Sequence, residues 1–150
     1  MTKKEAISDF LSQKRFALYG VSRNKHKFGN AILKELRNKG YELILIHPEC
    51  DMLENDKCYR SLRDIPATVD GVILSIKPEQ TEKVVKEIND AGIKRVWMQQ
   101  GSGSPTAVEL CKSNGISVID KECILMFAEP AQFFHRFHRW IWGAIGRLPS

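Results

Sequence analysis

The chain has 150 residues, of which 43% are hydrophobic and 27% are charged, and its formal net charge is +5. This length predicts a single domain with a core that needs no disulfide, and the apolar content excludes a disordered protein. No apolar run reaches the roughly 20 residues of a membrane-spanning helix, and the charged N-terminus lacks the apolar segment of a secretory signal. The four cysteines form no C-x-x-C pair. We therefore expect reduced thiols and a cytoplasmic protein.

The positive charge is concentrated in two stretches. Residues 10–34 contain six Lys and Arg without one acidic residue, and residues 133–150 contain three Arg, again without an acid. A basic protein can bind nucleic acid, but no helix-turn-helix, RNP or zinc-knuckle pattern accompanies these charges. We therefore expect no nucleic-acid partner and look for an acidic ligand near the first stretch.

Strand and helix patterns alternate along the chain. Near the N-terminus, Ile7, Phe10 and Leu11 predict a short amphipathic helix that covers the sheet. Short apolar runs then predict strands at residues 16–20, 42–48, 70–76, 94–100 and 116–119. Helical periodicity, with glycine stops, predicts helices at residues 28–38, 79–91 and 105–113.

This alternation is typical of an α/β protein with parallel β-α-β units. We predict a doubly wound sheet of about five strands in three layers, α/β/α, because the strands are apolar on both faces. Such sheets bind ligands beyond the carboxyl ends of their strands. Four segments therefore become candidates for a binding site: residues 20–29, 47–51, 75–78 and 99–104.

The segment between the first strand and the first helix has the composition of a phosphate-binding loop. Gly20 permits a tight turn, Ser22 and Asn24 can form hydrogen bonds, and Arg23, Lys25 and Lys27 supply positive charge. The following helix N-terminus also favours an anion. The dinucleotide fingerprint G-x-G-x-x-G, an acid at the end of the second strand and the Walker motif are all absent. The loop therefore predicts a phosphate-rich ligand without either common nucleotide signature.

Several short motifs, in order, resemble one known family. They are Gly20-Val-Ser-Arg, Lys27-Phe-Gly-Asn30, Gly40-Tyr, His47-Pro48, Cys58-Tyr-Arg-Ser-Leu62, Val96-Trp-Met-Gln-Gln-Gly101 and Cys123-Ile-Leu-Met-Phe-Ala-Glu-Pro130. Together they resemble the small stand-alone CoA-binding proteins, which are similar to the N-terminal CoA-binding domain of the succinyl-CoA synthetase α subunit. The resemblance covers approximately residues 12–130.

The resemblance implies a Rossmann-like domain that holds coenzyme A or an acyl-CoA across the strand ends. It places residues 22–25 against the ADP phosphates, residues 48–50 and 75–78 beside the nucleotide, and residues 98–101 along the pantetheine. With the neighbouring loop residues, the predicted ligand-binding set is Gly20, Ser22, Arg23, Asn24, Lys25, Lys27, Phe28, His47, Pro48, Cys50, Ser75, Ile76, Lys77, Pro78, Met98, Gln99, Gln100 and Gly101.

Two departures from the family limit what is carried over. Many relatives have Asn-Pro where this chain has His47-Pro48, and the synthetase domain with the phosphorylated histidine has no counterpart here. We therefore expect a CoA-binding module for which no catalysis is established. Two alternatives stay open: an enzyme acting on CoA esters or an NAD(P)-binding protein, and a membrane- or protein-associated adaptor regulated by CoA.

No catalytic or metal site is expected. Cys123 is interpreted as a small buried apolar residue, and its combination with His135 and His138 lacks the paired spacing of a structural zinc site. His26 and His47 are interpreted as polar loop residues, because no nucleophile or carboxylate at a diagnostic spacing accompanies them.

The last residues form a separate aromatic and basic segment. We expect residues 1–130 to form the CoA-binding domain with its N-terminal helix, and residues 131–150 to form a C-terminal helix or tail. Phe133, Phe137, Trp140 and Trp142 suit three roles: packing on the domain, a homodimer contact or adsorption to an anionic membrane.

Overall fold

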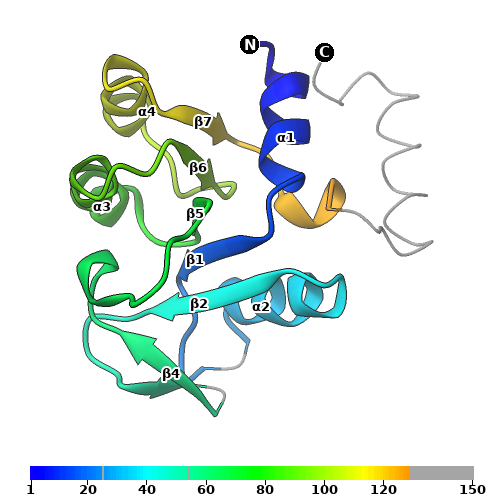
Figure 1. The fold of residues 1–150 in the computed structure, drawn as a ribbon, viewed down its shortest axis with the longest axis vertical. Coiled ribbons are helices and arrows are strands. Elements are labelled where there is room, and N and C mark those ends of the chain that lie inside the picture. Colours follow the sequence, from blue (N-terminus) through cyan, green and yellow to red (C-terminus); the bar gives the residue numbers. More distant parts are fainter. Residues whose placement is uncertain (25, 54, 129–150) are drawn as a thin grey trace.

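The computed structural model describes residues 1–24, 26–53 and 55–128. A seven-stranded sheet lies between helices on both of its faces, which gives the three layers seen in Figure 1. The helices are α1 (Lys3–Leu11), α2 (Phe28–Asn38), α3 (Pro78–Asp90) and α4 (Pro105–Ser113), with short 3-10 helices η1 (Leu62–Asp64) and η2 (Ile124–Met126). The strands are β1 (Arg15–Tyr19), β2 (Glu42–Ile46), β3 (Met52–Leu53), β4 (Asp56–Tyr59), β5 (Gly71–Leu74), β6 (Arg95–Met98) and β7 (Ser117–Asp120).

The sheet is doubly wound around its central strand. The strand order is β3-β4-β2-β1-β5-β6-β7, and every pair is parallel except β3 with β4. From β1 the chain passes to β2 on one side, and it later returns to β5 on the other. The predicted fold class is therefore confirmed, and the loops that follow β1 and β5 diverge at a switch point of the kind that binds ligands.

The expected number of strands was too small. The five predicted strands correspond to β1, β2, β5, β6 and β7, whereas β3 and β4 were missed. They form an antiparallel hairpin in which Met52 pairs with Lys57, and Asn55 adopts a positive φ of 64° beside the turn. With two and four residues, β3 and β4 are too short to show the apolar run by which the other strands are recognised.

Residues in each central strand alternate between two hydrophobic cores. Phe16 and Leu18 of β1 join the core beneath α1, α2 and η2, while Ala17 and Tyr19 join the core beneath α3 and α4. Both faces are therefore buried, which explains the continuous apolar runs. The expected N-terminal helix is α1, whose Phe10 ring stacks on Phe16 with a centroid distance of 4.6 Å.

The helices turn polar faces outward. Two of the predicted helix ranges, 28–38 and 105–113, agree with α2 and α4, and α3 begins one residue earlier than expected, at Pro78.

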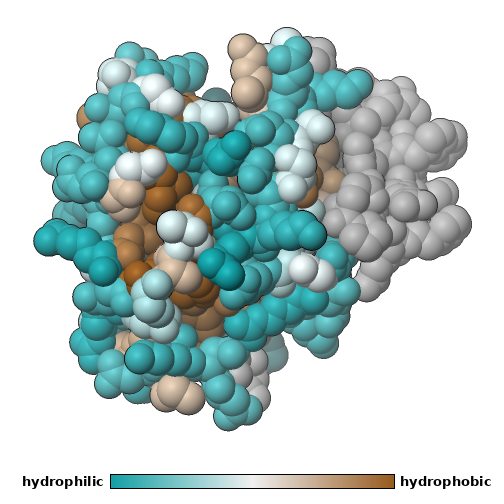
Figure 2. Space-filling model, in the orientation of Figure 1, coloured by the Kyte–Doolittle hydropathy of each residue, from teal (hydrophilic) through white to brown (hydrophobic). Residues whose placement is uncertain are grey.

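Figure 2 shows a mainly hydrophilic surface in which hydrophobic side chains gather in one hollow between α3 and β2. None of the helices among the described residues is long and apolar enough to cross a membrane. The predicted aromatic segment, residues 131–150, lies outside the described residues.

Candidate functional site

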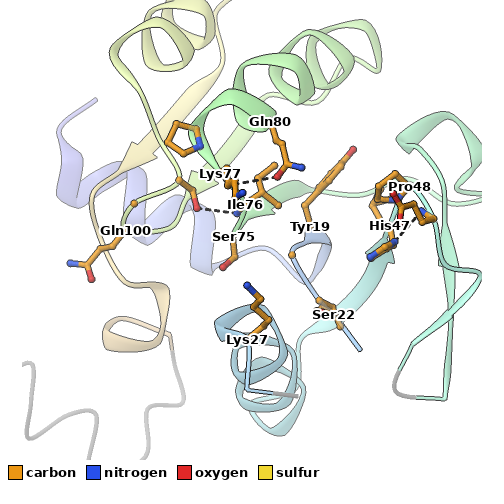
Figure 3. Close-up of a pocket in the computed structure, with 17 residues that line it drawn as sticks. Tyr19, Ser22, Lys27, His47, Pro48, Ser75, Ile76, Lys77, Gln80 and Gln100 are labelled. Carbon is orange, nitrogen blue, oxygen red and sulfur yellow. Dashed lines mark hydrogen bonds between the residues drawn. The ribbon is translucent and has the colours of Figure 1, made fainter. Parts of the chain in front are cut away.

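The carboxyl ends of four neighbouring strands surround a cavity of about 580 Å³, drawn in Figure 3. Its wall comprises residues 19–22, 46–49, 75–78 and 100–102, which follow or end β1, β2, β5 and β6, together with Lys27 and Gln80. We call this cavity the strand-end pocket. Its volume lies in the usual range of small-molecule sites, which is about 300–1,000 Å³.

Two glycines let the first loop fold tightly against the pocket floor. Gly20 has a φ of +117°, and a Cβ atom there would lie 2.2 Å from the carbonyl oxygen of Ser75. A Cβ on Gly29 would lie 2.2 Å from the carbonyl oxygen of Gly20. Any larger residue would clash with backbone atoms, so Gly20 and Gly29 allow the start of α2 to approach the ends of β1 and β5.

Asn30 in the first turn of α2 holds the same loop. Its side-chain oxygen accepts a hydrogen bond from Ser22 N at 2.9 Å, and its side-chain nitrogen donates to Ser22 O at 2.8 Å. Asn30 is buried, with 8% of its surface exposed. Both backbone polar groups of Ser22 are therefore satisfied, and the side chain of Ser22 faces the pocket from a fixed position.

Two helices begin at the pocket, each preceded by a lysine. Lys27 is the N-cap residue of α2 and Lys77 that of α3, and both line the pocket. Figure 3 shows Lys27 and Ser75 pointing into the same part of the cavity. Two ammonium groups and two helix N-termini favour anionic groups, whereas Glu49 adds one carboxylate at the rim.

The far side of the pocket is held by a hydrogen bond between two loops. The buried Ser102 hydroxyl accepts a hydrogen bond from Ile76 N at 3.1 Å, and Ser102 N donates to Gln99 O at 2.8 Å. Gln80, in the first turn of α3, accepts a hydrogen bond from Lys77 N at 3.4 Å. The bond from Ile76 N to Ser102 connects the loop after β5 to the loop after β6, and the other two bonds hold each loop locally.

Most of the residues predicted from the sequence meet at this pocket. Those that line it are Gly20, Ser22, Lys27, His47, Pro48, Ser75, Ile76, Lys77, Pro78, Gln100 and Gly101. They come from segments up to about 80 positions apart, and the parallel sheet brings them together because its carboxyl ends share one edge. Their contact with a ligand stays a prediction.

The other predicted residues lie elsewhere. Arg23 and Asn24 are exposed and outside the pocket wall, and Phe28 faces a separate surface cavity on α2. Cys50 and Met98 belong to the two cores, and the buried Gln99 accepts a hydrogen bond from Ile124 N at 3.0 Å through its side chain. Lys25 lies outside the described residues.

The predicted ligand-binding set omits six residues of the pocket wall, although Glu49 lies within the range 48–50 that the resemblance places beside the nucleotide. They are Tyr19, Val21, Ile46, Glu49, Gln80 and Ser102. Glu49 and Ser102 fall within the candidate segments 47–51 and 99–104, so position alone could have identified them. Nothing local distinguishes Tyr19 and Ile46 from core residues, because each is the last residue of a buried strand.

Burial raises the pKa of one residue of the pocket wall and of two cysteines in the cores. Burial raises the pKa of Tyr19 far above its ordinary value, and the nearby carboxylate of Glu87 adds to this shift. Burial also raises the pKa of Cys58, and it raises the pKa of Cys111 to about 11. Within residues 1–24, 26–53 and 55–128, no group of three His, Cys, Asp or Glu could hold a metal ion.

Comparison with protein families then identifies the domain. The family described as CoA binding domain matches residues 14–129, which is most of the chain. The chain belongs to the CoA-binding domain family. The expected resemblance to small stand-alone CoA-binding proteins is thereby confirmed.

Individual relatives of the CoA-binding domain are of two kinds. The uncharacterized protein YneT of Bacillus subtilis (strain 168) is 30% identical over 122 residues, which cover 81% of this chain and 90% of YneT. The ADP-forming acetate–CoA ligase I of Archaeoglobus fulgidus is 26% identical over 120 residues, 73% of this chain but 18% of the ligase. This chain therefore spans about a fifth of that enzyme.

A solved structure shares the fold along most of both chains. A conserved hypothetical protein from Pyrococcus furiosus superposes with a TM-score of 0.70 and 37% identity, covering 74% of this chain and 96% of that one. The same fold therefore occurs in a small chain of its own and within a much longer CoA ligase.

Proposed function

We propose that the protein binds coenzyme A or an acyl-CoA in the strand-end pocket, as a module without catalysis of its own. The observation that carries this proposal is the convergence of two lysine-preceded helix N-termini on a pocket of a CoA-binding domain. Coenzyme A carries a diphosphate and a ribose phosphate, so it can use both cationic positions.

The pocket provides places for the two ends of such a ligand. The loop of residues 20–22, with Lys27 and the start of α2, suits the diphosphate, because backbone and ammonium groups can approach it closely. His47 and Pro48 follow β2, where nucleotide-binding sheets hold the ribose. Residues 100–101 then flank the pantetheine side, in accordance with the family resemblance.

No reaction is assigned to the pocket. Its described residues offer no nucleophile paired with a base, and Tyr19 stays neutral because burial raises its pKa. The acetate–CoA ligase activity belongs to a protein of which this chain spans 18%. All four cysteines are free, which supports the proposal that the protein works in the reducing cytoplasm.

Isothermal titration calorimetry of the full chain tests this function. The ligands are CoA, acetyl-CoA, dephospho-CoA, NAD and NADP. We expect CoA or acetyl-CoA to bind more tightly than the other three. Dephospho-CoA and NAD lack the ribose phosphate, and NADP carries it at a different ribose position and has a nicotinamide nucleotide in place of the pantetheine. Undetectable binding of CoA and acetyl-CoA at near-millimolar ligand would refute the proposal, and tighter binding of NAD or NADP would favour the dinucleotide alternative.

A further inference from the structure

The ring of His47 closes the loop that follows β2. Its Nδ1 atom accepts hydrogen bonds from Glu49 N at 3.0 Å and from Cys50 N at 3.1 Å. The backbone N–H of His47 donates to Tyr59 O at 2.9 Å, which fixes the residue to β4. Figure 3 shows the ring at the pocket wall, with its hydrogen-bonded side turned toward the loop.

These two hydrogen bonds determine the tautomer of the neutral ring. A nitrogen that accepts hydrogen bonds carries no hydrogen, so the single ring hydrogen of neutral His47 lies on Nε2. Within the described part of the chain, no hydrogen-bond partner is assigned to Nε2. A doubly protonated ring would direct a hydrogen on Nδ1 at two N–H groups, so protonation must break the closure of the loop.

Charged and titratable groups surround His47 on several sides. Glu49 and Asp51 belong to its own loop, Tyr59 ends β4, and Lys27 and Lys77 line the pocket from the starts of α2 and α3. Arg60 donates to Pro48 O at 2.9 Å and pairs with Asp51 at 3.0 Å. Arg60 therefore still holds Pro48 when the His47 ring is protonated. Only the N–H groups of Glu49 and Cys50 then lose their acceptor.

We propose that His47 is a positioning residue of the CoA site that works only in its neutral form. Nδ1 shapes the loop, and Nε2–H donates to a ligand oxygen on the ribose side of the pocket; this inference rests on the proposed CoA binding. It predicts that acid which protonates the ring weakens CoA binding, because a protonated Nδ1 can no longer accept the two hydrogen bonds. A cationic His47 that simply attracted phosphate would give the opposite dependence.

Calorimetry at two pH values tests this role. Wild type, His47→Asn and His47→Ala are titrated with CoA at about pH 7.5 and about pH 5.5. Asparagine places its side-chain oxygen near the position of Nδ1 and does not titrate, so His47→Asn should keep the loop closed and bind CoA more tightly than His47→Ala, although its amide stops short of the Nε2 position. His47→Ala should bind about fivefold more weakly than wild type, or worse.

The decisive quantity is the affinity of wild type relative to His47→Asn. The phosphates of CoA also change charge over this range, but that change affects all variants alike. We expect the wild-type affinity, divided by that of His47→Asn, to fall about fivefold between the two pH values. An unchanged ratio, or one that rises at low pH, would overturn the inference.

A measurement without ligand separates this inference from the proposed function. In a two-bond ¹H–¹⁵N spectrum of the full chain, the signals of His47 are those that disappear in His47→Asn. We expect the Nε2–H tautomer at about pH 7.5, and the Nδ1–H tautomer would refute the role. If the Nε2–H tautomer is present but no variant binds CoA, the proposed function fails and the loop closure alone stands.

Discussion

At the scale of single residues, the pocket depends on the absence of two side chains. The hydrogen atoms of Gly20 and Gly29 face the carbonyl oxygens of Ser75 and Gly20, at positions where a Cβ would lie 2.2 Å away. The loop after β1 therefore packs backbone against backbone. A phosphate group can approach such a loop because no side chain covers its N–H groups.

Replacing Gly29 by alanine should disturb this packing. Because the clash involves backbone atoms, we expect Gly29→Ala to lower the free energy of unfolding by about 2 kcal/mol and to abolish CoA binding. Gly40→Ala is the control: Gly40 has a φ of +95° but no atom within 4 Å of its would-be Cβ. Its cost is about 1 kcal/mol of backbone strain, with CoA affinity retained. Chemical denaturation and calorimetry measure both quantities, and equal CoA affinity in the two variants would contradict this account.

At the scale of elements, α2 and α3 each begin at the pocket without a Ser, Thr or Asp cap. Lys27 and Lys77 occupy the N-cap positions. A lysine side chain cannot accept a hydrogen bond from the helix N-terminus, so it adds a positive charge where the helix already favours an anion. The arrangement is unfavourable for the isolated helices and is suited to an anionic ligand.

Removing these two charges should weaken CoA binding. We expect Lys27→Ala with Lys77→Ala to reduce affinity at least about tenfold, because each lysine forms a charge-assisted contact. Lys34→Ala with Lys86→Ala removes the same charge from the same helices at exposed positions outside the pocket wall, and it should have little effect. Calorimetry at low and high salt compares the pairs, and the difference should shrink at high salt. Equal losses in both pairs would place the phosphates elsewhere.

At the scale of the whole molecule, the sheet topology creates the pocket. The chain leaves β1 toward β2 on one side of the sheet and leaves β5 toward β6 on the other. The loops after the neighbouring strands β1 and β5 therefore diverge and leave room between them. All residues of the pocket wall lie between positions 19 and 102, and the two cores extend from Ala6 to Ala128.

We therefore propose that a chain ending at residue 130 folds and binds CoA like the full chain. Among the described residues, the two cores extend from Ala6 to Ala128 and the pocket wall from Tyr19 to Ser102. Calorimetry with CoA and thermal unfolding, compared with the full chain, measure this. A tenfold loss of affinity in the shorter chain would show that residues 131–150 contribute to the site. Co-sedimentation of both chains with anionic vesicles tests the proposed membrane contact, which requires the full chain to sediment more.

Local patterns predicted much of the fold but a smaller part of the site. The helix over Phe28–Asn38 and the buried strands follow from periodicity and from glycine stops, which act within a few residues. Arg23 was predicted to contact the ligand from its basic loop and from the family resemblance; it is exposed outside the pocket wall, and its contact with a ligand stays a prediction. Charge in a loop indicates a region, whereas the direction of each side chain depends on packing.

The sequence by itself determined the order of strands and helices, the doubly wound class and the segments that meet at the strand ends. Only the tertiary structure decided the β3–β4 hairpin, the contact of Gly29 with Gly20, the bond from Ile76 N to Ser102 and the position of the His47 ring at the pocket wall. The first group depends on periodicity and turn chemistry within a few residues. The second depends mainly on which distant backbone atoms come within contact distance, and this is settled only when the sheet assembles.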